Sequence, residues 1–115
     1  MSRLVIDAHL TSQARLAIIA SLVPGEALTF TQLKEMTSLA DGNLHVQARR
    51  LADAGYIEIA KGMRGNRSLT RFKITELGLE SLRLLVRRLQ AILATESGRI
   101  EPRRNRPRED SQVWM

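Results

Sequence analysis

Residues 41–75, DGNLHVQARRLADAGYIEIAKGMRGNRSLTRFKIT, decide the fold of this chain. The first part of this stretch repeats apolar residues at helical spacing and predicts a helix whose buried stripe is Leu44, Ala48, Leu51 and Ala52. Asp41 is the predicted N-cap, because a carboxylate can accept hydrogen bonds from the free amides of a first helical turn. Gly55 is the predicted stop, because the left-handed conformation is least costly for glycine. The stretch therefore begins with a short helix that buries one side.

The second part of the stretch predicts a β-hairpin. In YIEIAK, Ile57 and Ile59 point to one side, and in LTRFKI, Phe72 and Ile74 do the same. Such alternation is typical of strands that bury one face. The residues that favour a turn between the two strands are Gly62, Gly65 and Asn66.

The flanking sequence supplies the remaining elements. A first core helix is predicted over SQARLAIIASLV, capped by Thr11 or Ser12, and residues 27–30 form a short strand that joins the hairpin. Thr31 is the predicted cap of a short second helix, and Thr75 caps a long last helix. The expected fold is mainly α with a small β-wing (α+β), in which a helix-turn-helix is followed by the wing.

The predicted third helix and the wing carry side chains that suit a DNA groove. An amide can pair with adenine, an arginine with guanine, and a valine with the methyl group of thymine. The candidate base-reading residues share one helix face and are Asn43, Val46, Gln47 and Arg50. The candidate phosphate contacts lie around that face and on the wing, and are Thr31, Gln32, His45, Arg49, Lys61, Arg64, Asn66, Arg67 and Arg71. Any one of them could be an ordinary solvated residue, so the hypothesis depends on their arrangement.

The order of three short motifs resembles that of winged helix-turn-helix transcriptional regulators. These motifs are D-G-N-L at residues 41–44, L-x-x-A-G-Y at 51–56, and a T-x-x-x-x-T-x-x-G run at 70–78. The chain is similar over residues 8–93 to the small single-domain branch of the MarR-like and ArsR-like repressors. The resemblance implies a homodimer that binds operator DNA, with the third helix in the major groove and the wing near the phosphates.

The last helix, residues 76 to about 95, carries more apolar surface than a lone helix on a small domain buries. A two-fold dimer that packs this helix and the amino-terminal segment across its axis is the interpretation we favour. A larger monomer core, in which the amino terminus covers the helix, is the alternative. The predicted dimer residues are Leu4, Ile6, Leu10, Leu82, Leu85, Val86, Leu89, Ile92 and Leu93.

Composition agrees with a nucleic-acid partner. The net charge is +6 and the pI is about 11.0, which suits a polyanion. Residues 1–96 are expected to form the DNA-binding domain, and residues 97–115 a basic disordered tail rich in Pro and Arg. Cysteine is absent, which excludes disulfides and cysteine-ligated metals. We expect a cytoplasmic protein with no membrane partner, no metal and no cofactor.

The sequence therefore predicts a double-stranded DNA-binding regulator, with repression as the favoured role. No nucleophile, base and orienting group occur together in a way that supports an enzyme. The alternative is a winged-helix module that binds another protein without sequence-specific DNA binding, although such a surface would be richer in aromatic anchors. The operator, the target genes and any effector ligand are left open by the sequence.

Overall fold

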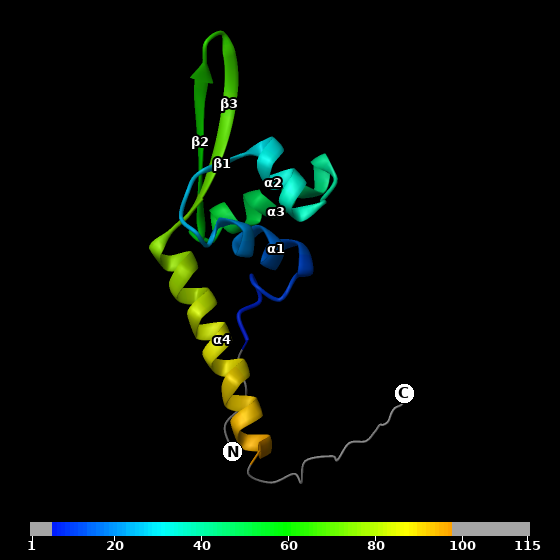
Figure 1. Cartoon of the computed structure of the whole chain (residues 1–115), viewed down its shortest axis with the longest axis vertical. Coiled ribbons are helices and arrows are strands. Elements are labelled where there is room, and N and C mark those ends of the chain that lie inside the picture. The colour runs from blue at the N-terminus through cyan, green and yellow to red at the C-terminus, as the bar shows by residue number, and fades with distance from the viewer. Residues whose placement is uncertain (1–5, 98–115) are drawn as a thin grey trace. The chain divides into compact units, whose positions relative to one another are not determined.

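The computed structural model describes residues 6–97, and side chains through residue 94. Its elements, in chain order, are α1 (Gln13–Leu22), β1 (Leu28–Thr29), α2 (Phe30–Thr37), α3 (Asp41–Asp53), β2 (Ile57–Arg64), β3 (Arg67–Ile74) and α4 (Glu76–Ser97). Figure 1 shows β2 and β3 extending as a long hairpin beyond α2 and α3. The predicted fold, a helix-turn-helix followed by a β-wing, is confirmed. Ser97, the first residue of the predicted tail, ends α4, and residues 98–115 lie outside the described residues.

The chain divides into two compact units, Met1–Leu85 and Val86–Met115. The first unit contains the helix-turn-helix, the wing and the beginning of α4. The second contains, in its described part, the remainder of α4. No helix within residues 6–97 combines the length and apolar character needed to cross a bilayer.

The sheet is antiparallel, with strand order β1-β3-β2. Ile59 pairs with Phe72, and Leu28 of the short strand pairs with the other side of Phe72. Phe72 is consequently buried, whereas Glu58 and Lys73, which point the opposite way, are exposed. The predicted alternation and the predicted joining of the short strand to the hairpin are both confirmed.

The hairpin is longer than the sequence predicts. Arg64 pairs with Arg67, so the loop consists of Gly65 and Asn66 alone. Gly65 has φ 61°, which is the value that a type II′ turn requires at its first central residue and that glycine adopts readily. The prediction that Gly62 belongs to the turn is wrong, because Gly62 lies inside β2 and pairs with Leu69.

The N-caps of the two helices of the helix-turn-helix differ from the prediction. Helix α2 is capped by Thr29 instead of Thr31, because Thr29 and Gln32 form a reciprocal capping box. Helix α3 has Ala40 at its N-cap position, without a side-chain cap. Asp41 is the first helical residue, where its charge still favours the positive helix end. The cap of α1 is Ser12, which accepts a hydrogen bond from a backbone amide of the first turn.

The core of the first unit lies where α1, α2 and α3 meet the base of the sheet. The fully buried side chains are Leu10, Ile18, Ile19, Leu22, Leu33, Leu44, Leu51 and Phe72. Leu44 and Leu51 of the predicted α3 stripe are among them, Ala48 is also buried, and Ala52 packs at the edge of the stripe. Gly55 has φ 84° directly after α3, which confirms the predicted stop.

The junction between the wing and α4 explains the T-x-x-G part of the third motif. The hydroxyl oxygen of Thr75 accepts a hydrogen bond from the amide of Gly78, as predicted for a cap. A Cβ atom at Gly78 would lie 2.2 Å from the carbonyl oxygen of Tyr56. Only glycine therefore allows α4 to begin this close to Tyr56, which lies between α3 and β2.

Candidate nucleic-acid interface

The exposed side of α3 carries the residues that were predicted to read bases. Asn43 and Arg50 are exposed, Val46 is 49% exposed, and Gln47 is half-buried. The opposite side of the helix is formed by the buried residues Leu44, Ala48 and Leu51. Burial of that side fixes the direction in which the other side faces. The helix therefore presents an amide, a guanidinium and a branched apolar group together.

Gln47 differs from the other three because both the oxygen and the nitrogen of its amide are already engaged. Its Oε1 accepts a hydrogen bond of 2.7 Å from Nη1 of Arg15, and its Nε2 donates one of 3.1 Å to Oδ1 of Asn43. Arg15 belongs to α1 and was not singled out by the sequence analysis. Nothing local could have indicated this contact, because Arg15 and Gln47 are 32 residues apart.

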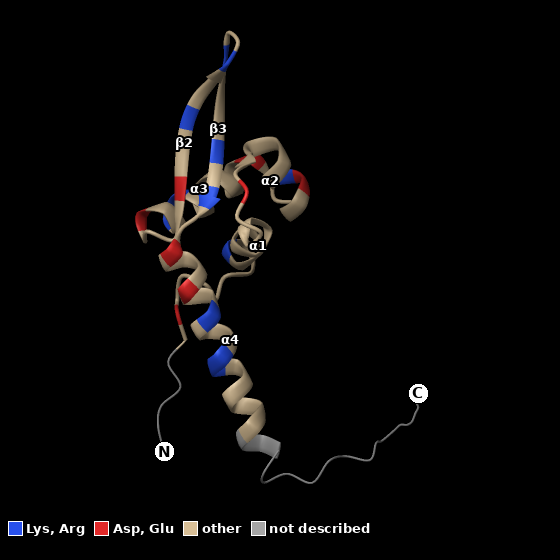
Figure 2. Ribbon diagram, turned by 60° about the vertical axis from the view of Figure 1, so that its left-hand side comes forward, with Lys and Arg blue, Asp and Glu red and all other residues tan. Residues whose placement is uncertain are grey.

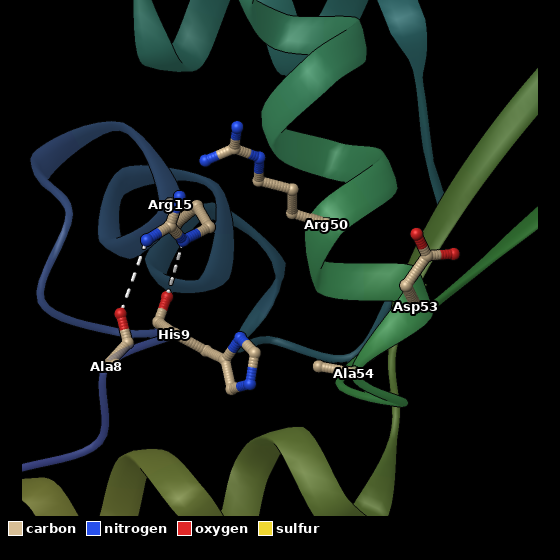
Figure 3. Close-up of a pocket in the computed structure, with 6 residues that line it drawn as sticks. All are labelled: Ala8, His9, Arg15, Arg50, Asp53 and Ala54. Carbon is tan, nitrogen blue, oxygen red and sulfur yellow. Dashed lines mark hydrogen bonds between the residues drawn. The ribbon is translucent and has the colours of Figure 1, made fainter.

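Arg15 also holds the segment that precedes α1. Its Nε donates to the carbonyl of His9 at 2.8 Å, and its Nη2 donates to the carbonyl of Ala8 at 3.2 Å (Figure 3). Arg50 lies beside it, and both residues line a groove of about 550 Å³. The lining residues are Ala8, His9, Arg15, Arg50, Asp53 and Ala54.

Tyr56 fixes the same segment from the other side. Its hydroxyl donates to a carboxylate oxygen of Asp7, and its ring meets that of His9 edge to face at 5.4 Å. Burial raises the pKa of Tyr56, and the hydrogen bond to Asp7 raises it further. The hydroxyl is therefore protonated at neutral pH and remains a donor.

The side of α3 nearer to α2 is held by different contacts. The ring of His45 stacks on Phe30 with centroids 4.4 Å apart and an interplanar angle of 21°. Lys34 of α2 pairs with Asp41 at 2.6 Å, although both side chains are largely exposed. His45, predicted as a phosphate contact, is exposed on the flank of the helix and stacks on Phe30 at the same time. Arg49 lies nearby on the solvent side, with Asp53 at 4.0 Å.

A second groove, of about 470 Å³, separates the start of α2 from the wing tip. It brings together Thr31, Arg64 and Arg67, which were predicted as phosphate contacts from two distant parts of the sequence. The other lining residues are Thr29, Phe30, Ser68, Leu69 and Thr70. Thr29 was also considered as a phosphate contact from the sequence, whereas Ser68 and Thr70 were not predicted. Gln32 is exposed, but its Oε1 is committed to the capping box.

The wing is basic along its length. Lys61, Arg64, Arg67 and Arg71 are all exposed, and within residues 6–97 none of them forms an ion pair. Figure 2 shows Lys and Arg on both strands and at the tip of the hairpin. Asn66 occupies the turn itself. Unpaired, solvated cations on a protruding hairpin are suited to phosphate oxygens.

The residues predicted for a dimer interface fall into two groups. Leu10 is fully buried in the core of its own unit, Leu85 is 7% exposed, and Ile6 and Leu82 pack against that core. The prediction of Leu10 as an interface residue is therefore replaced by a core role, because it has no surface left for a second copy. The exposed members are Val86, Leu89, Ile92 and Leu93. Leu4 lies outside the described residues.

Metal ligands do not gather in the described part of the chain. Across residues 6–97, His, Asp and Glu do not form any group of three that could hold a metal ion.

Comparison with known proteins agrees with this geometry. The family described as winged helix DNA-binding domain matches residues 14–93. An uncharacterized protein of Methanocaldococcus jannaschii is 37% identical over 67 residues, which are 58% of this chain and 73% of that protein. A transcriptional regulator homologue from Pyrococcus horikoshii OT3 has a similar structure, with a TM-score of 0.69 and 28% identity over 76% of this chain and 86% of that one.

More distant structures share the fold. BpsR of Bordetella bronchiseptica, a DNA-binding protein regulated by 6-hydroxynicotinic acid, matches with a TM-score of 0.63 and 16% identity. That match covers 86% of this chain and 74% of BpsR. MarR of E. coli matches with a TM-score of 0.62 and 19% identity, over 81% of this chain and 71% of MarR. The winged helix family predicted from the sequence is confirmed by the family match, and these two structures show that MarR-like regulators share its fold. The matched fold is that of transcriptional regulators, not of enzymes.

Proposed function

Because the chain belongs to the winged helix DNA-binding domain family, and is by fold a DNA-binding transcription regulator, we propose that it reads a specific duplex sequence as a homodimer. Helix α3 enters the major groove and the wing lies along phosphates or in the adjacent minor groove. A dimer bound to a promoter excludes other proteins from the same DNA, so repression is the expected effect.

The observation that carries the proposal is that α3 and the wing expose different kinds of side chain. The exposed side of α3 offers Asn43, Val46 and Arg50, which match the hydrogen-bonding and methyl groups of base edges. The wing offers cations and the α2 groove offers hydroxyl groups, which match phosphates. An interface for another protein would present aromatic or other large apolar anchors at its centre. Among the described aromatic residues, Phe30 is half-buried and Tyr56 and Phe72 are buried.

The homodimer is supported by α4. Val86, Leu89, Ile92 and Leu93 are between 39% and 68% exposed, and they recur at the spacing of one helix face. A contiguous apolar surface of this kind marks an interaction site. A second copy is the simplest occupant, because a self-complementary helix face closes under two-fold symmetry.

Selection of bound sequences from random duplex DNA tests the function. We expect enrichment of a pseudo-palindrome with half-sites about 10 base pairs apart, one turn of the double helix. The wild-type protein should prefer the enriched duplex over random competitor by at least about a thousandfold at moderate salt. If no duplex is preferred, the proposal of a sequence-specific regulator is wrong, and the alternative of a winged-helix module that binds another protein is favoured.

The change Leu89→Glu tests the dimer. A carboxylate at this position is solvated in a monomer but desolvated in a dimer, so association should be lost while folding is retained. Sedimentation should give a dimer for the wild type and a monomer for the variant, with sharply weaker binding to the selected duplex. Gln90→Glu is the matched control, because it adds the same charge at the neighbouring exposed residue. A wild-type monomer at high micromolar concentration would contradict the proposal.

A further inference from the structure

The hydrogen bonds around Gln47 have a polarity that only one arrangement satisfies. An arginine side chain donates hydrogen bonds and accepts none, so the atom of Gln47 that faces Arg15 must be its oxygen. The nitrogen of the same amide then faces Asn43, and the atom of Asn43 that receives it must also be an oxygen. Arg15 therefore determines the orientation of two amides in succession.

This orientation determines which group Asn43 presents on the exposed side of α3. With its Oδ1 facing Gln47, the NH2 group is the end of the Asn43 amide that faces away from Gln47, and no described residue accepts a hydrogen bond from that group. Asn43 is exposed on α3, whereas Gln47 and Arg15 are half-buried behind it. The exposed end of this chain of hydrogen bonds is therefore a pair of N–H donors.

We infer that Arg15 is a positioning residue for base recognition: through Gln47 it holds the amide of Asn43 so that its NH2 group meets an acceptor edge of one base. This inference rests on the proposed DNA-binding function and makes it more specific. Purine N7, guanine O6 and thymine O4 are the acceptors in the major groove, whereas cytosine presents a donor there. Gln47, predicted to read a base itself, becomes the link between Arg15 and the reader.

Three hydrogen bonds hold the guanidinium group of Arg15 in one position. Its Nε and Nη2 are held by two consecutive carbonyls of the segment before α1, and only Nη1 is directed to Gln47. A planar guanidinium fixed at two points has little freedom at the third. That segment is itself held by the contacts of Tyr56 with Asp7 and His9. The side chain of Asn43 is thus linked, through Gln47 and Arg15, to the segment before α1, and these contacts restrict its rotation.

The test measures base preference with the full-length protein on the duplex selected by the wild type. The probes are that duplex and versions substituted one base pair at a time, and the quantity compared is the ratio of their affinities. Arg15→Met and Gln47→Met should each lower this ratio about fivefold at one and the same base pair, part of the discrimination of a good base contact. The double variant should lose no more than either single one, because both act through one contact.

The change Gln47→Glu should alter which base is preferred, and not only weaken the preference. A carboxylate still accepts from Arg15 but cannot donate to Asn43, so the Asn43 amide should turn and donate to Glu instead. Its oxygen then faces the DNA, and the preference at that base pair should shift toward a donor, cytosine N4 or adenine N6. The ratio cancels any general loss of affinity that the added negative charge causes.

Controls separate positioning from stability and charge. Arg83→Met removes a cation of α4 whose partner is Glu80, and it should leave the ratio unchanged. If Arg15→Met fails to fold, the two Gln47 variants decide, because they keep the bonds of Arg15 to Ala8 and His9. A preference retained by the Gln47 variants overturns the inference, whereas a wild type without any preferred duplex overturns the proposed function itself.

Discussion

Helix α3 and the tip of the wing are the two regions of the first unit that we propose to face DNA, and they are held in opposite ways. On one flank α3 is fixed by Arg15 through Gln47, and on the other by the stack of His45 on Phe30. Its underside is buried in the core. The wing tip, residues 63–68, is exposed on every residue and is held by the ladder between β2 and β3.

This difference matches what each region has to recognise. A base edge has donors and acceptors at fixed positions, so its reader gains from side chains that are oriented before binding. A phosphate is charged and accepts hydrogen bonds from many directions, so a mobile cation serves as well as a fixed one. We therefore expect changes near α3 to alter stability and sequence preference, and changes on the wing to alter general affinity.

The largest contrast should appear in the free energy of unfolding. Leu44→Ala removes a fully buried side chain beneath α3 and should cost about 3 kcal/mol. Met63→Ala removes a side chain of similar size that is 64% exposed on the wing, and should change stability by less than about 0.5 kcal/mol. Urea unfolding followed by circular dichroism measures both. Equal losses would show that the wing is part of the cooperative core.

The next contrast concerns sequence preference. Arg50→Ala or Asn43→Ala should each cost about 1–3 kcal/mol on the selected duplex and relax the preference at one base pair. Titration of substituted duplexes by fluorescence anisotropy gives both quantities. Arg83→Ala, on exposed α4, is the control for loss of a cation. Uniform weakening on all sequences would mean that α3 contacts phosphates only.

The wing arginines should behave differently. Arg64→Ala and Arg67→Ala should each weaken binding to the selected duplex and to random DNA by the same factor. Each should reduce the slope of log affinity against log salt by about one unit, since one phosphate contact is lost. Binding isotherms at several salt concentrations provide the slopes. A change of base preference in these variants would reverse the roles that we assign to the two regions.

The smallest expected effect separates packing from phosphate contact at His45. His45→Phe keeps an aromatic ring on Phe30 and should leave both affinity and salt slope unchanged within about 0.5 kcal/mol. His45→Ala removes the stack and should lower the free energy of unfolding by about 1 kcal/mol. Unfolding and binding measured on the same samples distinguish the two. A reduced slope of log affinity against log salt in His45→Phe would mean that the wild-type His45 contacts a phosphate.

Two of the sequence errors, the cap at Thr31 and the turn at Gly62, share one cause. Thr31 has the chemistry of an N-cap, but α2 begins two residues earlier because Thr29 ends β1, pairing with Arg71, and forms the capping box. Gly62 has the chemistry of a turn, but the register of β2 and β3 places the turn at Gly65. In each case the local signal was correct in kind, and a pairing partner far along the chain decided the position.

The sequence by itself determined the elements, the buried stripe of α3 and the basic character of the wing, because each depends on the periodicity or composition of neighbouring residues. Only the tertiary structure decided which amide is free to read a base. Asn43 and Gln47 have the same functional group, one turn apart, and no local pattern distinguishes them. The difference arises because folding brings Arg15 of α1 against Gln47, and a guanidinium can only donate.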